Sequence, residues 1–251
     1  SRRGGCMDYK TWDEFWAKFL QITFHVQNPE RWPSRERRAQ WCLSHLGVDS
    51  GSKILNVGCG DGVLDICFSR LGMDVTAVDR NPSVLLHAKT EDDTRRVNFV
   101  VSDLRDLNLP SGSFQSALFL ECSGLVKKEQ DLQLFKNIYE WLRPGGKLIV
   151  DCPLSEELSG SWSKVFPEGE LTFNHSFEPK TRMFRIEPSF KDLSGHIFGL
   201  MDPLRDSLPG LSRYYYPKAE ITSMLESVGF SVRDADRHYY GEKYFAVLAE
   251  K

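Results

Sequence analysis

The chain has 251 residues, of which 41% are hydrophobic and 27% are charged, so it can bury a sizeable core as one domain. Its net charge of −3 and the lack of any run near the roughly 18 apolar residues of a membrane span speak against nucleic-acid and membrane partners. The chain does not open on a signal-peptide pattern, and its six cysteines show no metal-ligand spacing, which predicts a cytoplasmic protein without a metal site.

Two helices are expected before the main fold. Apolar residues at spacings of three and four over residues 12–20 predict one helix with an aromatic face, and a second pattern over residues 39–46 ends at Gly47. The run between them contains Arg31, Arg35, Arg37 and Arg38. Such a run is usually a solvated helix face, but one guanidinium could instead pair with a carboxylate of a ligand.

A buried strand that ends in a glycine-rich turn is predicted over residues 54–62, with Gly58, Gly60 and Gly62 at alternate positions. Glycine accepts positive φ angles and lets a ligand lie against bare backbone. The second strand ends at Asp79, about twenty residues after the first glycine, where α/β nucleotide-binding folds hydrogen-bond a ribose. The alternating glycines differ from the G-x-G-x-x-G spacing of nicotinamide-dependent dehydrogenases. A tight turn without any ligand is the structural alternative.

The following segments continue an alternation of strands and helices. Residues 97–101 and 114–120 predict the third and fourth strands, and Asp103 follows the third. A Pro-Gly-Gly turn at residues 144–146 leads into a fifth strand over residues 148–151. This order of elements predicts a parallel sheet with right-handed crossovers.

A long segment separates the fifth strand from the next helix, which is predicted over residues 217–228. A structureless loop of this length is implausible in a compact domain. Alternation over residues 171–177 and 183–187 predicts a β-hairpin, and a further strand is expected near residues 196–200. We therefore expect residues 155–213 to form an antiparallel β cap beside the site.

The glycine loop, Asp79, Asp103 and the Pro-Gly-Gly turn, in this order, resemble the class I S-adenosylmethionine (SAM)-dependent methyltransferases. The resemblance covers roughly residues 50–153 and the C-terminal elements. It implies a Rossmann-like α/β fold with N-terminal helices and a seven-stranded, mostly parallel sheet. The last strand, over residues 243–249, would run antiparallel between its neighbours.

The resemblance also implies how the chain is divided. Residues 1–49 would form an N-terminal helical lid, although its aromatic helix would serve equally well as core against the sheet. Residues 50–251 would form the methyltransferase domain, with residues 155–213 inserted as a substrate cap.

The cofactor implied by the resemblance is S-adenosyl-L-methionine, and the product is S-adenosyl-L-homocysteine. The implied cofactor-binding residues are Gly58, Cys59, Gly60, Asp61, Gly62, Asp79, Arg80, Ser102, Asp103, Leu104 and Glu121. Asp79 would accept hydrogen bonds from the ribose, and Asp103 from the adenine amino group. The alternative for Asp103 is a turn acid that begins a loop.

The implied reaction is in-line transfer of a methyl group to an oxygen or nitrogen of a small-molecule metabolite, which the protein promotes mainly by positioning the acceptor. A base helps when the acceptor must lose a proton. Candidate catalytic residues are His175, His196 and Glu121, followed by His25 and Tyr214. Each of them, taken singly, is more often structural than catalytic.

Two other functions stay open, a SAM-binding but catalytically silent partner subunit and a protein or RNA methyltransferase. The sequence lacks the Asn/Asp-Pro-Pro-aromatic motif and the Pro-Cys pair of nucleobase methylation, which disfavours that substrate class. A nucleic-acid substrate would also give steep salt dependence. Nothing in the sequence indicates an oligomeric state.

Overall fold

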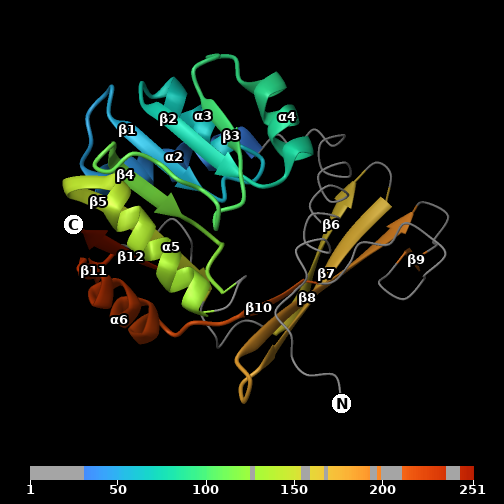
Figure 1. Cartoon of the computed structure of the whole chain (residues 1–251). Coiled ribbons are helices and arrows are strands. Elements are labelled where there is room, and N and C mark those ends of the chain that lie inside the picture. The colour runs from blue at the N-terminus through green and yellow to red at the C-terminus, as the bar shows by residue number, and fades with distance from the viewer. Residues whose placement is uncertain are drawn as a thin grey trace.

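A central sheet organises the computed structural model of the chain, with strands in the order β11-β12-β5-β4-β1-β2-β3 (Figure 1). The structure describes residues 31–124, 128–153, 159–166, 169–192, 197–198, 211–235 and 244–251. The helices are α2 (Arg31–Leu46), α3 (Val63–Arg70), α4 (Pro82–Glu91), α5 (Lys128–Trp141) and α6 (Lys218–Val228). The central strands are β1 (Lys53–Val57), β2 (Asp74–Asp79), β3 (Asn98–Val101), β4 (Phe114–Phe119), β5 (Leu142–Pro153), β11 (Ser231–Asp234) and β12 (Tyr244–Glu250).

Most of the central sheet is parallel. Strands β3, β2, β1, β4 and β5 pair in parallel, whereas β12 lies antiparallel between β5 and β11. The prediction of a seven-stranded, mostly parallel sheet with a reversed last strand is confirmed.

Helices cover both faces of the central sheet (Figure 1). Helices α5 and α6 contribute to one buried cluster, and α2 and α3 contribute to another on the opposite face. Successive side chains of a strand point to opposite faces of the sheet, so neighbouring residues of β5 belong to different clusters. Leu148 and Val150 pack with α5 and α6, and Ile149 packs with α2 and α3. Burial on both faces explains why the central strands are continuous apolar runs in the sequence.

A second, antiparallel sheet lies beyond the carboxyl ends of β1, β2 and β4 (Figure 1). Its strands are β6 (Gly160–Phe166), β7 (Gly169–Glu178), β8 (Met183–Asp192), β9 (Ile197–Phe198) and β10 (Leu211–Tyr214). They pair in the order β10-β8-β7-β6, and β9 pairs with β8. The predicted hairpin corresponds to β7 and β8, and the further strand expected near residues 196–200 is the short β9.

Two elements begin earlier than the sequence predicted. Helix α2 begins at Arg31, eight residues before the expected start at Ala39, and Pro33 lies in its first turn, where its missing N–H has no partner to lose. Strand β5 begins at Leu142 and contains the Pro-Gly-Gly segment. Its pairing with β4 shifts from Phe114–Leu142 to Ser116–Lys147, so extra residues of β5 lie between these two pairs. The segment expected as a turn is therefore a bulge within a strand.

The predicted helix over residues 12–20 lies outside the described residues. None of the helices in the described part of the chain is long and apolar enough to cross a membrane.

Candidate cofactor and methyl-transfer site

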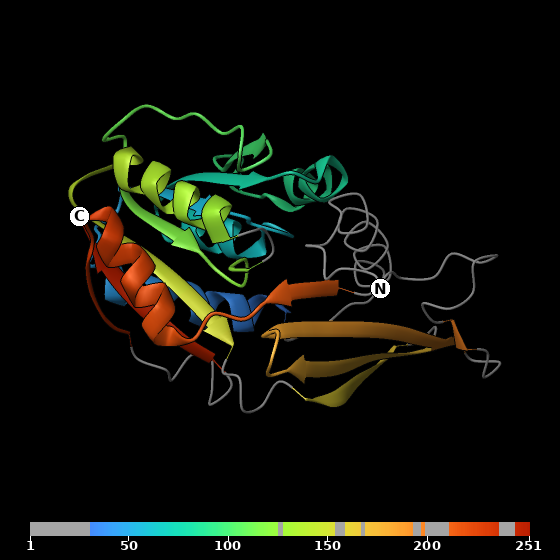
Figure 2. The same cartoon turned by 60° about the horizontal axis from the view of Figure 1, so that its bottom comes forward.

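The candidate site lies at the carboxyl ends of the parallel strands, where open α/β sheets bind their ligands. The loops after β1, β2, β3 and β4 meet at this edge, which faces the second sheet (Figure 1). Strand β10 leads from the second sheet back to α6 (Figure 2). The residues predicted at the ends of these strands therefore lie on the side of the central sheet that faces the second sheet.

The three glycines after β1 have positive φ angles, of 77° at Gly58, 57° at Gly60 and 68° at Gly62. A β-carbon would lie 2.5 Å from the sulfur of Cys122 at Gly58, and 2.7 Å from the β-carbon of Ala88 at Gly62. At Gly60 it would meet no described atom within 4 Å. Packing thus explains the outer two glycines, and the middle one leaves bare backbone that a ligand can approach.

Asp79 holds this loop through both carboxylate oxygens. Its Oδ2 accepts a hydrogen bond from the Gly60 N–H at 3.0 Å, and its Oδ1 accepts one from the Asn81 N–H at 3.0 Å. These bonds place the carboxylate beside the Gly60 backbone, at the position where α/β nucleotide-binding folds hydrogen-bond a ribose. The open backbone at Gly60 and the adjacent carboxylate fit a nucleoside-containing cofactor such as SAM.

Asp61 and Cys59 complete the glycine loop. Asp61 Oδ1 accepts a hydrogen bond from the Val63 N–H at 3.2 Å, and its Oδ2 lies 3.6 Å from Arg31 Nη2. Arg31 also pairs with Glu91 at 3.0 Å, so it joins α2 to the glycine loop and to α4. Cys59 is buried, and burial raises the pKa of its thiol well above the usual value. This thiol is therefore protonated and serves as a packing group.

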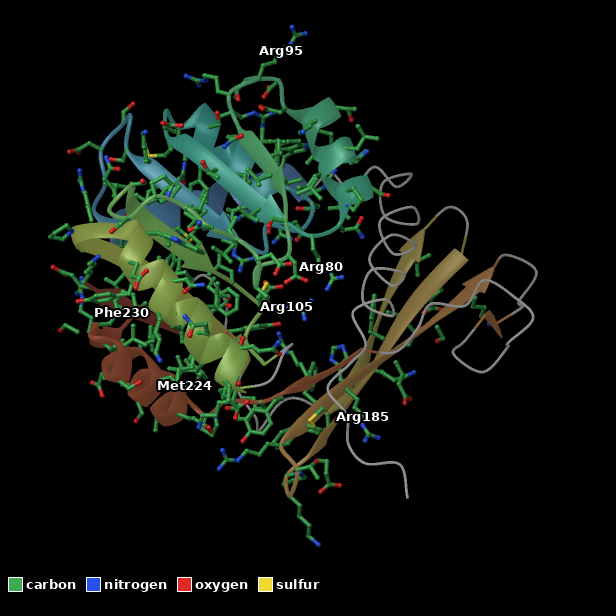
Figure 3. All side chains as sticks on the ribbon, viewed as in Figure 1. Arg80, Arg95, Arg105, Arg185, Met224 and Phe230 are labelled. Carbon is green, nitrogen blue, oxygen red and sulfur yellow. The ribbon has the colours of Figure 1, made fainter. Side chains whose placement is uncertain are left out.

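Asp103 is held by two arginines. Arg105 donates to its two oxygens from Nε at 2.8 Å and from Nη2 at 2.6 Å, and Arg80 Nη1 lies 3.4 Å from Oδ2. The hydrogen bonds from Arg105, helped by the charge of Arg80, lower the pKa of Asp103 to about 2 against the opposing effect of burial. Arg80 and Arg105 lie at the edge that faces the second sheet (Figure 3). The carboxylate that we expected at the adenine is thus ionised, and both of its oxygens accept hydrogen bonds from the Arg105 guanidinium.

The neighbours of Asp103 have structural contacts as well. The Ser102 N–H donates to the carbonyl oxygen of Asp79 at 3.0 Å, which aligns the ends of β2 and β3. Leu104 is partly buried against the cluster beneath α5 and α6. The predicted adenine-side residues are therefore brought next to the predicted ribose acid.

Four charged residues gather after β4 and β5, and we call them the edge cluster: Arg38, Glu121, Asp151 and Arg213. Arg38 donates to Glu121 Oε1 at 3.0 Å and to Asp151 Oδ2 at 3.2 Å. Asp151 also accepts a hydrogen bond from the Glu121 N–H, and Arg213 donates to the Glu121 carbonyl oxygen at 2.7 Å. The edge cluster thus joins α2, the central sheet and β10.

Glu121 is the exposed member of the edge cluster. It has a φ of 60°, which is costly for a residue with a β-carbon and is typical of functional sites. Its side chain is 48% exposed, whereas the side chains of Arg38 and Asp151 are 6% and 0% exposed. The rigid pair beneath therefore holds Glu121 at the surface of the site.

The two carboxyl groups of the edge cluster differ in their affinity for a proton. Burial raises the pKa of Asp151, and the charge of Arg38 only partly offsets this. For Glu121, partial desolvation by the surrounding protein acts in the same direction, but the charges of Arg38, Arg35 and Arg213 outweigh it and lower the pKa. Glu121 therefore stays ionised at neutral pH, which suits binding or orienting a substrate better than accepting a proton.

The next catalytic candidate within the described residues is His175. It is half-buried on β7, and its ring packs edge-on against Phe184 with centroids 5.5 Å apart. The Arg213 guanidinium lies 5.6 Å from the same Phe184 ring. The Tyr214 hydroxyl instead accepts a hydrogen bond from Arg182 at 3.2 Å. His25 and His196 lie outside the described residues.

Asp151 and Arg213 were not among the sequence-predicted site residues, and Arg38 was considered only as one of a run of arginines of which one could pair with a ligand. The rule that selected Asp79 and Glu121, a polar residue at the carboxyl end of a parallel strand, also selects Asp151. No comparable signal distinguishes Arg38 from its neighbouring arginines. Among the described residues, no group of three or more His, Cys, Asp or Glu side chains could hold a metal ion.

The strand order, the reversed β12 and the glycine loop beside Asp79 define a Rossmann-like fold of the methyltransferase type. The model of a methyltransferase domain family matches residues 54–146. The chain is 28% identical to the cypemycin N-terminal methyltransferase of Streptomyces sp over 218 residues, which cover 82% of this chain and 83% of that protein. It is 29% identical to the mitochondrial ubiquinone biosynthesis O-methyltransferase of Mus musculus, with coverage of 71% and 51%.

Solved structures show the same fold. The CcbJ methyltransferase of Streptomyces caelestis matches with a TM-score of 0.70 and 15% identity, over 86% of this chain and 88% of that one. CalS10, an amino pentose methyltransferase from Micromonospora echinaspora, matches with a TM-score of 0.71 and 14% identity, over 92% and 96%. At these identities the two structures support the fold, and the sequence matches show similarity to methyltransferases. The chain spans about half of the mouse O-methyltransferase.

Proposed function

We propose that this chain transfers a methyl group from SAM to an oxygen or nitrogen of a small-molecule acceptor by in-line displacement. The observation that carries the proposal is the bare backbone at Gly60 beside the Asp79 carboxylate, one strand away from the exposed Glu121. The names of two relatives, an N-terminal methyltransferase and an O-methyltransferase, support both acceptor types. A cytoplasmic location likewise stays a prediction.

In this proposal the loop after β1 and the ends of β2 and β3 hold the cofactor. Gly58, Gly60 and Gly62 shape the backbone, and the Asp79 carboxylate accepts hydrogen bonds from the ribose hydroxyls. Cys59, Asp61, Arg80, Ser102, Asp103 and Leu104 line the remainder of the cofactor site. The Asp103 carboxylate accepts three hydrogen bonds from Arg105, so in this proposal it contributes mainly its negative charge beside the adenine.

Bound SAM supplies an electrophilic sulfonium methyl group, so the main task of the protein is to position the acceptor. An acceptor atom held about 3 Å away and in line with the departing sulfur gains several kcal/mol from positioning alone. Glu121, ionised and held by Arg38, orients the acceptor in this proposal. His175 and His196 are the proposed bases for an acceptor that must lose a proton.

Calorimetry with SAM and with NADH tests the cofactor assignment. We expect the wild-type protein to bind SAM and not NADH. Asp79→Ala should weaken SAM binding about 10- to 100-fold, as expected when a hydrogen bond to a charged group is lost. Asp79→Asn retains an acceptor for the Gly60 N–H and should fall in between. Asp74→Ala is the matched control, because Asp74 is exposed at the opposite end of β2.

Turnover then distinguishes the remaining functions. Release of S-adenosylhomocysteine with a library of amines, phenols and hydroxy acids would support the proposed enzyme. SAM binding without turnover on this library or on protein and RNA acceptors would support the silent partner subunit. Turnover on RNA that decreases steeply with salt would support the nucleic-acid alternative. Equal SAM binding by wild type and Asp79→Ala would contradict the assigned cofactor site.

A further inference from the structure

Arg213 lies on β10 of the second sheet and contacts the loop after β4 of the central sheet. It pairs with Phe184 in the register of β10 and β8, and its Nη1 donates to the carbonyl oxygen of Glu121 at 2.7 Å. The backbone beside it is closely packed, because the Tyr214 N–H donates to the Gly124 carbonyl oxygen at 2.8 Å and a β-carbon at Gly124 would lie 1.8 Å from the Tyr214 oxygen. The guanidinium is therefore held in place next to Glu121.

The hydrogen-bonding capacity of this guanidinium is largely unused. Arginine has five N–H donors, and within the described chain Arg213 donates only to a neutral carbonyl group. No carboxylate of the described residues lies within 4.0 Å of it, whereas Arg38 in the same cluster pairs with two. Its charge acts on Glu121 and Asp151 only at longer range. A half-buried guanidinium in this state is suited to a carboxylate or phosphate, which it binds through two parallel hydrogen bonds.

Aromatic side chains surround the same position. Phe184 and Tyr215 are 4% and 7% exposed and form a small buried cluster, with Phe177 partly buried against it. The Arg213 guanidinium lies 5.6 Å from the Phe184 ring, within the range of a cation–π contact, and His175 packs against the other part of that ring. The surroundings of Arg213 on the second sheet are therefore aromatic, and His175 and Phe177 are the half-buried members of this group.

We propose that Arg213 binds an anionic group, a carboxylate or phosphate, of a methyl acceptor that has an aromatic or apolar body. This inference rests on the proposed function and names the substrate class of that site. Arg213 is then a specificity-determining residue that brings the acceptor to the edge beside Glu121. The alternative role for Arg213 is that of a structural link between β10 and the loop after β4.

Calorimetry on the protein saturated with S-adenosylhomocysteine tests this proposal with three probes that share a phenyl ring. Benzoate and phenyl phosphate carry the two anionic groups, and benzamide is the neutral counterpart of benzoate. We expect wild type to bind at least one anion more tightly than benzamide. The tighter of the two anions identifies the source as a carboxylate or a phosphate.

Three variants separate substrate binding from a structural link. Arg213→Gln should weaken binding of the preferred anion about 10- to 100-fold and leave benzamide binding unchanged, because only the charged hydrogen bonds are lost. Arg213→Lys keeps the charge without the fork and should lose less. Arg185→Gln is the control, because Arg185 lies exposed on the neighbouring strand β8 (Figure 3).

The proposal is overturned when neither anion binds better than benzamide, or when Arg213→Gln weakens all three probes equally, as a structural link predicts. Equal losses in Arg213→Gln and Arg185→Gln would also overturn it, since they indicate unspecific attraction to positive charge. Binding of S-adenosylhomocysteine is measured first for every protein. Failure of wild type at that step contradicts the proposed function, whereas intact cofactor binding without an anion preference contradicts this inference alone.

Discussion

The central sheet and the second sheet contribute to the same site but are stabilised in different ways. Apolar clusters cover both faces of the central sheet. The described contacts between the second sheet and the central domain include three polar ones, Arg213 with Glu121, Tyr214 with Gly124, and Arg182 with Glu220. The Tyr214 ring also packs against the cluster beneath α5 and α6. The comparison indicates that the central sheet determines the stability of the chain, and that the second sheet mainly adds side chains for the acceptor.

Deleting one aromatic ring in each region is the strongest test of this difference in stability between the two sheets. Phe119 is 1% exposed and packs edge-on against Phe135, so Phe119→Ala should lower the free energy of unfolding by about 3–5 kcal/mol. Phe184→Ala removes a ring from a much smaller cluster and should cost less than half as much. Urea denaturation followed by circular dichroism measures both losses. Equal losses of unfolding free energy would contradict the conclusion that the central sheet contributes most of the stability.

A buried acid, Asp131, lies where the loop after β4 and the segment after β10 meet, and its contribution to the free energy of unfolding depends on pH. Asp131 on α5 accepts hydrogen bonds from the Gly124 N–H at 2.9 Å and from the Tyr216 hydroxyl at 2.9 Å. Burial raises the pKa of Asp131 to about 7, although both hydrogen bonds favour the ionised form. An unfolded chain releases this proton near pH ~3.9. Between these two pH values the folded protein holds a proton that the unfolded chain has lost, so stability falls as pH rises.

We therefore expect Asp131→Asn to flatten part of the pH dependence of stability between about pH 4 and pH 7. The raised pKa of wild-type Asp131 corresponds to a loss of up to about 4 kcal/mol across this window, at about 1.4 kcal/mol per pKa unit. Urea denaturation at a series of pH values measures the difference. Asp74→Asn, on an exposed residue, should retain the wild-type slope. An unchanged slope in Asp131→Asn would show that Asp131 is ionised in the folded protein.

The smallest expected effect concerns the ion pair that fixes the hairpin of β7 and β8 to α6. Arg182 is 44% exposed and lies 2.7 Å from Glu220, so Arg182→Ala should lower the free energy of unfolding by about 1 kcal/mol or less. Amide hydrogen exchange should nevertheless become faster in β8 and at Tyr215, whose N–H donates to the Arg182 carbonyl oxygen. The control Arg185→Ala, which changes an exposed residue of β8, should leave this exchange unchanged. Faster exchange in β1 or β4 would contradict independent behaviour of the second sheet.

The parts of the fold that depend on local patterns could be predicted from the amino-acid sequence. The apolar runs, the three glycines and Asp79 are encoded within short segments, because each expresses a backbone requirement or a strand end. The order of these segments, together with the resemblance to a family, led to the central sheet and the reversed last strand. The start of α2 was missed because an arginine-rich run contains no apolar period to mark a buried helix.

Which charged side chains contact one another depends on the three-dimensional fold. Arg38 is separated by 83 residues from Glu121 and by 113 from Asp151, and no periodicity relates one helix to the ends of two distant strands. The same applies to Arg213, whose position beside Glu121 depends on how β10 passes between the two sheets. The Asp103 pair with Arg105 is local, but its geometry depends on the backbone turn after β3. Contacts between side chains far apart in the chain are set by packing, and the sequence pattern of either segment does not contain them.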